Sequence, residues 1–99
     1  MIHELKIYSQ FVRPILSGEK TFEIRQNDRC FQKGDRVNFS VNKDQWAHDN
    51  KSAVLELERK TFVITYVISG WGLKNGFVVF GFKEQNSVRD KKEGIEVRG

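Results

Sequence analysis

The chain has 99 residues, of which 38% are hydrophobic and 12% aromatic, and its formal net charge is +4. This length fits one domain with one core, and no apolar run reaches the roughly 20 residues of a membrane-spanning helix. The basic excess favours a polyanionic partner such as RNA or DNA.

Cysteine usage points to a reducing compartment and away from metal chemistry. Cys30 is the only cysteine, so it cannot form an internal disulfide. Neither a CxxC pair nor a cluster of histidines is present, and we therefore expect no metal site and no cofactor. We expect Cys30 to be a half-buried structural thiol in a cytoplasmic protein.

The first 20 residues predict a strand and then a short helix. HELKIY alternates polar and apolar residues, as a half-buried strand does. In the following SQFVRPILSGEK, apolar residues recur at helical spacing, Ser9 is a candidate N-cap and Gly18 a candidate stop. Because Pro14 lies inside this segment, the helix is expected to begin near Arg13 or to be confined to its first turns.

The segment TFEIR predicts a second strand with two distinct faces. Side chains of a strand alternate, so Phe22 and Ile24 share one face, which we expect to point into the core. The other face carries Thr21, Glu23 and Arg25 and would ordinarily be the solvent face. Lys20 at the end of the helix and the wholly polar loop at 26–29 weigh against an ordinary exposed face.

Short strands joined by turns dominate the rest of the chain. In chain order we expect a turn at 33–35, a strand at 37–41, a polar loop at 43–52, two strand segments at 54–58 and 62–68, a glycine-rich turn at 70–76 and a closing strand at 77–83. The total predicts a mostly β protein with some α structure: a small, mainly antiparallel β-barrel of five to six strands with one short helix after the first strand. The domain is expected to span 1–85, with a polar, flexible tail at 86–99.

Aromatic residues have two interpretations. The eight phenylalanines lie mostly at strand spacing and are expected in the core. Trp46, in the polar loop, is equally suited to stacking on an unpaired base and to packing on the barrel. Packing over a barrel end is favoured for Trp71, which glycines flank, and His48 is expected to be a solvated loop residue.

Four residues form a motif, G-x-K-x-x-E-x-R, at Gly18, Lys20, Glu23 and Arg25. This motif, at the junction of the first helix and the next strand, resembles that of the ASCH domains, whose fold is similar to the RNA-binding PUA domain. The later KGDRVNF resembles the G-D-x-V strand of the same family, and the likeness extends over 2–83, closest to a small bacterial and phage subgroup. The resemblance implies a PUA-like barrel with a cleft beside the motif for RNA or a nucleotide-sized ligand.

The chemistry of the motif agrees with such a ligand. Arg25 can grip a phosphate or a base edge with its planar fork, and Lys20 can supply a point charge. Glu23 can accept a hydrogen bond from a base amine, act as a general base, or simply orient the two cations. The residues expected to bind the ligand are Lys20, Thr21, Glu23, Arg25, Asn27, Arg29 and Trp46.

Two alternatives remain open. Some ASCH relatives hydrolyse N4-acetylcytidine with a lysine, a threonine and a distant glutamate. In this resemblance Lys20 corresponds to the lysine, and Glu23 occupies the position of the threonine, which is therefore lost. Thr21 is an imperfect substitute for it, and Glu56 or Glu58 stands for the distant acid. Catalytic roles would then fall to Lys20 and Glu23. In the other alternative the chain is an interaction protein whose motif only fastens the helix to the strand. The oligomeric state is left open.

Overall fold

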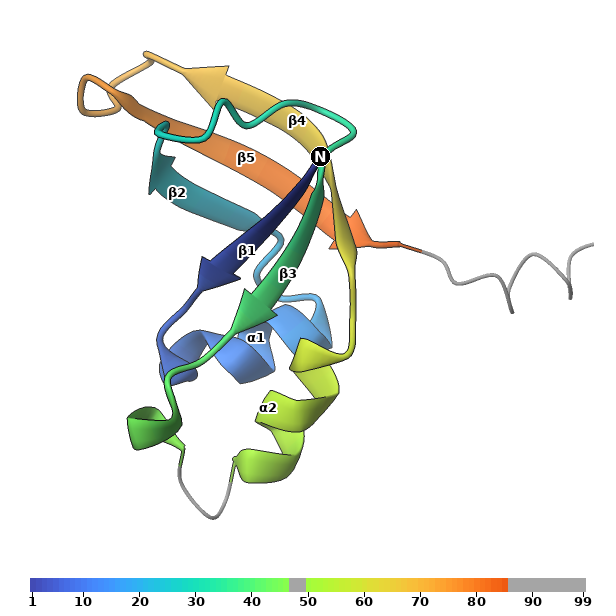
Figure 1. The fold of residues 1–99 in the computed structure, drawn as a ribbon. Helices are drawn as coiled ribbons and strands as arrows, with labels where there is room; N and C mark the ends of the chain where they lie inside the picture. Colours follow the sequence, from blue (N-terminus) through green and yellow to red (C-terminus); the bar gives the residue numbers. More distant parts are fainter. Residues whose placement is uncertain (47–49, 86–99) are drawn as a thin grey trace, which may run out of the picture.

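A computed structural model of the chain describes residues 1–46 and 50–85. Within them the protein is mostly β with two short helices, and its strands form one curled sheet, a half-barrel (Figure 1). The strands are β1 (Ile2–Lys6), β2 (Phe22–Gln26), β3 (Arg36–Ser40), β4 (Phe62–Ser69) and β5 (Phe77–Glu84). The predicted mostly β, barrel-like fold is confirmed.

The sheet has the order β1-β3-β4-β5-β2. Only β1 and β3 pair in parallel, and the other neighbours are antiparallel, as predicted. A bulge in β4 between Ile64 and Tyr66 adds to the bend of the sheet. β1 and β2 are therefore the two edge strands, although the chain connects them through a single helical segment.

Helix α1 (Val12–Ser17) occupies the predicted place and ends as predicted. Gly18 terminates it with φ 83°, the left-handed conformation that glycine adopts without a steric penalty. Pro14 lies in the first turn, where its missing N–H removes no helical bond. The prediction of Ser9 as N-cap was wrong, because a 3-10 turn at Ser9–Phe11 precedes the helix and makes Phe11 the capping residue.

Helix α2 (Lys51–Glu58) replaces the strand predicted at 54–58, which was wrong. Ala53, Val54 and Leu57 are buried, and their spacing places them on one face of a helix. The intervening Leu55 is 39% exposed, so the apparent alternation did not mark a strand face. Both helices lie at one end of the sheet, where α1 contacts α2 and α2 contacts β3 (Figure 1).

Aromatic rings fill much of the core inside the curl. Phe39, Phe62 and Phe82 contact one another with ring centroids 5.3–5.4 Å apart, and Phe31 lies 4.9 Å from Phe80. These five phenylalanines are buried, which confirms the core prediction for them. The largest departure is Phe22 in β2, which is 44% exposed.

Two loop residues predicted to pack are exposed instead. Cys30 has φ 51° and its side chain is in solvent, because the neighbouring Phe31 takes the core position. Trp71 is 89% exposed at the tip of the β4–β5 turn, so it does not pack over the end of the sheet. The predictions for His48 and for a flexible tail at 86–99 lie outside the described residues.

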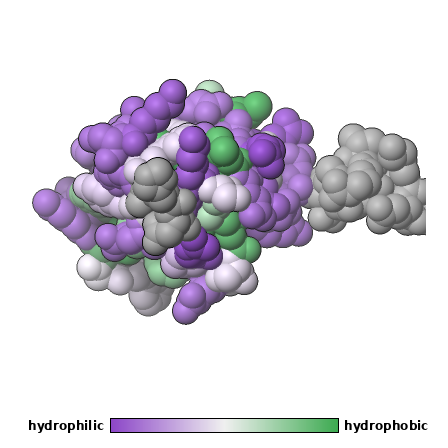
Figure 2. All heavy atoms as spheres, turned by 90° about the horizontal axis from the view of Figure 1, so that it is seen from below, coloured by the Kyte–Doolittle hydropathy of each residue, from purple (hydrophilic) through white to green (hydrophobic). Residues whose placement is uncertain are grey.

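The end of the molecule that carries the helices is mainly polar. Figure 2 shows this end, with hydrophilic side chains over most of the surface and hydrophobic ones in small separate patches. Among residues 1–46 and 50–85, no helix is long and apolar enough to cross a membrane.

Candidate functional site

The two faces of β2 are the reverse of the predicted ones. Glu23 is 5% exposed, whereas Phe22 is 44% and Ile24 55% exposed. The carboxylate face therefore points into the molecule and the apolar face points out. Burial of a carboxylate requires compensation by opposite charge and hydrogen bonds, and the motif residues supply both.

Lys20 and Arg25 hold the Glu23 carboxylate from both sides. Lys20 Nζ donates to Glu23 Oε2, and Arg25 Nε donates to Oε1 at 2.9 Å. Lys20 also donates to the carbonyl of Phe22 at 2.7 Å and lies 4.9 Å from the ring centroid of Phe11. Because two cations meet one carboxylate, the cluster keeps one excess positive charge.

Arginine side chains also bridge the two edges of the sheet. Arg25 Nη2 donates to the carbonyl of Lys6 at 2.6 Å, and Arg29 Nη1 donates to the carbonyl of Glu4 at 2.9 Å. These carbonyls belong to β1, so the guanidinium groups connect β2 and the loop after it to β1 where a closed barrel would have a backbone ladder. The opening of the half-barrel is thus polar and positively charged.

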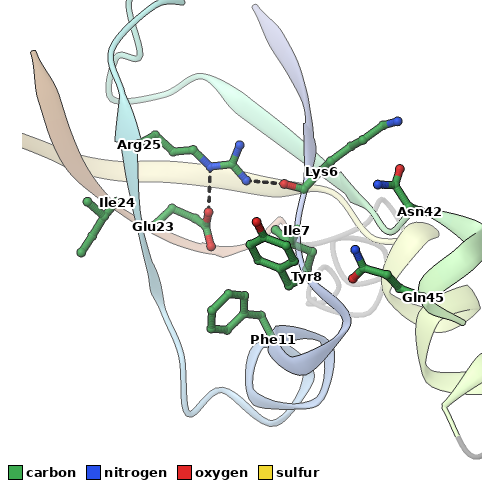
Figure 3. Close-up of a pocket in the computed structure, with 9 residues that line it drawn as sticks. All are labelled: Lys6, Ile7, Tyr8, Phe11, Glu23, Ile24, Arg25, Asn42 and Gln45. Atoms are coloured by element: carbon green, nitrogen blue, oxygen red, sulfur yellow. Dashed lines mark hydrogen bonds and ion pairs between the residues drawn. The ribbon is translucent and has the colours of Figure 1, made fainter. Parts of the chain in front are cut away.

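An open cleft of about 410 Å³ lies at this junction, and we name it the β1–β2 cleft. Its lining residues are Lys6, Ile7, Tyr8, Phe11, Glu23, Ile24, Arg25, Asn42 and Gln45. Figure 3 shows Arg25 reaching across to Lys6 above the rings of Tyr8 and Phe11, with Asn42 and Gln45 on the far side. This volume lies within the range of pockets that hold small ligands, about 300–1,000 Å³.

Backbone groups of β2 also face the cleft. Thr21 O accepts from Phe82 N at 2.9 Å and Asn27 N donates to Gly76 O at 2.8 Å. In an antiparallel ladder the hydrogen-bonded positions alternate, so the N–H and C=O of Ile24 point away from β5. The side chain of Ile24 turns out of the cleft (Figure 3), which leaves its backbone as the part that lines the wall.

The structure brings together the three central motif residues but separates the predicted rim. Arg25 and Glu23 line the cleft, whereas Lys20, whose side chain is 15% exposed, lines a different depression beside β5. Arg29 reaches the same strand edge through Glu4 but is not part of the lining. Thr21 is exposed and lines the same depression as Lys20, away from the β1–β2 cleft.

Two further predicted rim residues have other roles. Asn27 Oδ1 accepts from Phe31 N at 3.1 Å, and Asn27 lines a second pocket beside the β4–β5 turn. Trp46 packs against the core, and its Nε1 donates to Val41 O at 3.1 Å. The indole is therefore committed to the fold and does not line the cleft.

The sequence did not reveal the opposite wall of the cleft. Tyr8 is 65% exposed, and Gln45 Oε1 accepts from Ser9 N at 3.1 Å, which leaves its NH2 group to donate. Gln45 belongs to the polar loop that contains Trp46, and the polar composition of this loop was the one sequence signal that pointed to this wall of the cleft. Tyr8 follows β1 without any motif of its own.

A second polar cluster fixes the loop before β3. His3 Nε2 and Asp35 Oδ2 are 2.8 Å apart, and Gln32 N donates to the same oxygen at 3.2 Å. Burial raises the pKa of Asp35, but hydrogen bonds from His3 and Gln32 and the charges of His3 and the N-terminus outweigh it, so the pKa is lowered from 3.8. In the described part of the chain, no three His, Cys, Asp or Glu residues are placed to hold a metal ion.

Comparison with known protein families identifies a family for the chain. No curated protein matches the chain. A family model described as "Domain of unknown function (DUF3850)" matches residues 2–82. The match includes both helices and all five strands, apart from the last two residues of β5. The chain therefore belongs to the DUF3850 family.

Proposed function

We propose that this protein is an RNA- or nucleotide-binding module, and that the β1–β2 cleft holds one nucleotide. The observation that carries the proposal is the half-buried guanidinium of Arg25, fixed by Glu23 and Lys6 in a cleft with excess positive charge. The likeness of the motif to that of ASCH domains supports the same ligand class. A cytoplasmic location, where a lone thiol stays reduced, goes with this proposal.

The guanidinium of Arg25 is fixed in position and has free donors for an anion. Its Nε and one Nη2 hydrogen are used, which leaves Nη1 and the second Nη2 hydrogen for a phosphate. Because the ion pair with Glu23 and the bond to Lys6 fix the fork before binding, less conformational entropy is lost when the ligand arrives. Lys6, which also lines the cleft, adds positive charge.

The walls of the cleft suit a base. Tyr8 is largely exposed and lies beside Phe11, with ring centroids 6.4 Å apart, so its ring is available for stacking. The free NH2 of Gln45 can donate to a base oxygen or ring nitrogen, and the backbone of Ile24 offers one donor and one acceptor. Aromatic and amide groups around a fixed cation are typical of sites for unpaired nucleotides.

The amidohydrolase alternative receives less support from this geometry. Lys20 and Thr21 line one depression beside β5, but Lys20 Nζ is engaged by Glu23 and by the Phe22 carbonyl. A lysine that acts together with a hydroxyl needs an amine that is free to meet the substrate, and the ion pair with Glu23 holds this one. The interaction-protein alternative predicts no ligand, and the experiment below distinguishes it.

Binding of a short, fluorescein-labelled single-stranded RNA, followed by anisotropy at several salt concentrations, tests the proposal. Tyr8→Ala is expected to weaken binding about 5-fold or more, since stacking of one base contributes roughly 1–3 kcal/mol. Arg25→Lys keeps the charge but loses the fork, and we expect a loss of about 10-fold or more.

Tyr66→Ala is the matched control, because Tyr66 is 64% exposed and Tyr8 is 65% exposed, but Tyr66 lies on β4, outside the cleft. We expect this control to bind RNA as the wild type does. Unchanged binding in Tyr8→Ala and Arg25→Lys would exclude the cleft. Absence of any RNA or nucleotide binding, with folded protein, would favour the interaction-protein alternative.

A further inference from the structure

Trp71 has a left-handed backbone conformation that asparagine and glycine adopt more readily than tryptophan does. Leu73 N donates to Gly70 O at 2.9 Å, so residues 70–73 form a tight turn, and its central residues Trp71 and Gly72 have φ 54° and φ 90°. Two positive φ angles are those of a type I′ turn, in which Asn-Gly is strongly preferred. A tryptophan at the first central position is therefore unfavourable for the backbone.

The side chain of Trp71 does not stabilise the fold by packing. It is 89% exposed, the largest exposed fraction among the large hydrophobic residues of the described chain. An exposed aromatic ring held in a strained turn indicates a binding role, since neither local backbone preference nor core packing accounts for it.

A polar pocket of about 490 Å³ adjoins this turn, and we name it the hairpin pocket. Its lining residues are Asn27, Ser69, Gly70, Leu73, Lys74, Asn75, Gly76, Phe77 and Val78. Lys74 lies over the ring of Phe77 at 5.8 Å from its centroid, so a cation sits at the pocket wall. Trp71 does not line the pocket itself but follows Gly70, which does. Amides, a hydroxyl and an ammonium in the pocket, with an exposed indole on the adjoining turn, are groups that can hold a base and its phosphate.

The hairpin pocket lies close to the β1–β2 cleft. Arg25 lines the cleft and Asn27 lines the hairpin pocket, and two residues of extended chain span about 7 Å. Arg25 on β2 and Arg29 in the loop that follows β2 both donate to carbonyls of β1 and provide positive charge at this junction. The β1–β2 cleft and the hairpin pocket therefore adjoin β2 at neighbouring positions, and together they suit successive nucleotides of one strand.

From this placement we infer that the protein binds single-stranded nucleic acid across both places, with one nucleotide in the β1–β2 cleft and a base stacked on Trp71 at the hairpin pocket. The inference rests on the proposed function and narrows its ligand from a free nucleotide to a strand of several nucleotides. Lys74 contacts a phosphate of that strand, and Asn27 and Asn75 contact a base or sugar.

The test compares uridine monophosphate with a labelled single-stranded RNA of about eight nucleotides, a length within the usual site sizes of such proteins. Trp71→Asn creates the preferred Asn-Gly turn, so the variant is expected to fold at least as stably as the wild type. It should weaken binding of the RNA roughly 5- to 100-fold and leave binding of the mononucleotide unchanged. Trp71→Tyr should retain most of the affinity, and Lys74→Gln should lower the slope of log affinity against log salt by about 1.

Tyr66→Asn removes another exposed ring, 64% exposed, from β4 and should change neither affinity. If Trp71→Asn binds the RNA as the wild type does, while Arg25→Lys loses it, this inference is wrong and the cleft proposal stands. Wild-type protein that binds the RNA no more tightly than the mononucleotide also overturns the inference alone. If neither probe binds, both proposals fail.

Discussion

Replacement of Glu23 by alanine tests whether the buried carboxylate organises the motif. In the folded protein Glu23 is 5% exposed and accepts from both Lys20 and Arg25, whose side chains are 15% and 25% exposed. Removing one partner of a buried ion pair costs about 3–5 kcal/mol, because the remaining charges stay desolvated. Since both cations here retain some access to water, we expect a loss near the lower end, about 3 kcal/mol.

Urea denaturation followed by tryptophan fluorescence measures this change, and a thermal scan gives a second value. For a domain of this size, about 3 kcal/mol corresponds to a lowering of Tm by about 12–24 °C. Glu19→Ala is the control, because Glu19 is exposed just before the motif lysine, and its effect is expected within about 0.5 kcal/mol. A loss below about 1 kcal/mol in Glu23→Ala would refute the argument that the carboxylate organises this cluster.

A triple variant separates stability from binding. Lys20→Met, Glu23→Leu and Arg25→Met together remove every charge of the cluster and leave no ion unpaired. Well-packed apolar replacements of a buried ion network are often neutral or stabilising, so we expect most of the loss seen in Glu23→Ala to be recovered. RNA binding should nevertheless be lost in the triple variant, because the guanidinium that holds the phosphate is gone.

Two further predictions concern the rest of the fold. Because the pKa of Asp35 is lowered from 3.8 in the folded protein, its contribution to stability is present above pH 3.8 and is lost as the pH falls through the folded pKa. The difference in unfolding free energy between wild type and Asp35→Asn should therefore shrink from neutral to acidic pH, and a difference independent of pH would contradict it. On β2, Ile24→Thr should change stability by no more than about 0.5 kcal/mol, since Ile24 is 55% exposed, whereas Ile64→Thr, at a site 1% exposed, should cost about 2–4 kcal/mol. Equal losses in urea denaturation would mean that the β2 faces are assigned wrongly.

Local patterns predicted the elements whose signals act over a few residues. Gly18 ends α1 because only a residue without Cβ takes φ 83° at no steric cost. The pattern at 54–58 predicts a strand although the segment is helical, because a short apolar run satisfies both periods. The burial of Val54 and Leu57 on one helix face resolves the ambiguity only in the folded protein.

The sequence by itself determined that Glu23 and Arg25 share one face of a strand and that Lys20 lies beside them, because these residues are neighbours in the chain and side chains alternate along a strand. Only the tertiary structure decided which face is buried. Periodicity groups residues on a face, but the curl of the sheet turns that face of β2 toward β1 and the 3-10 turn at Ser9–Phe11. The tertiary structure also brought Tyr8 and Gln45 to the cleft from separate segments, since contacts between distant parts of a chain leave no local pattern in the sequence.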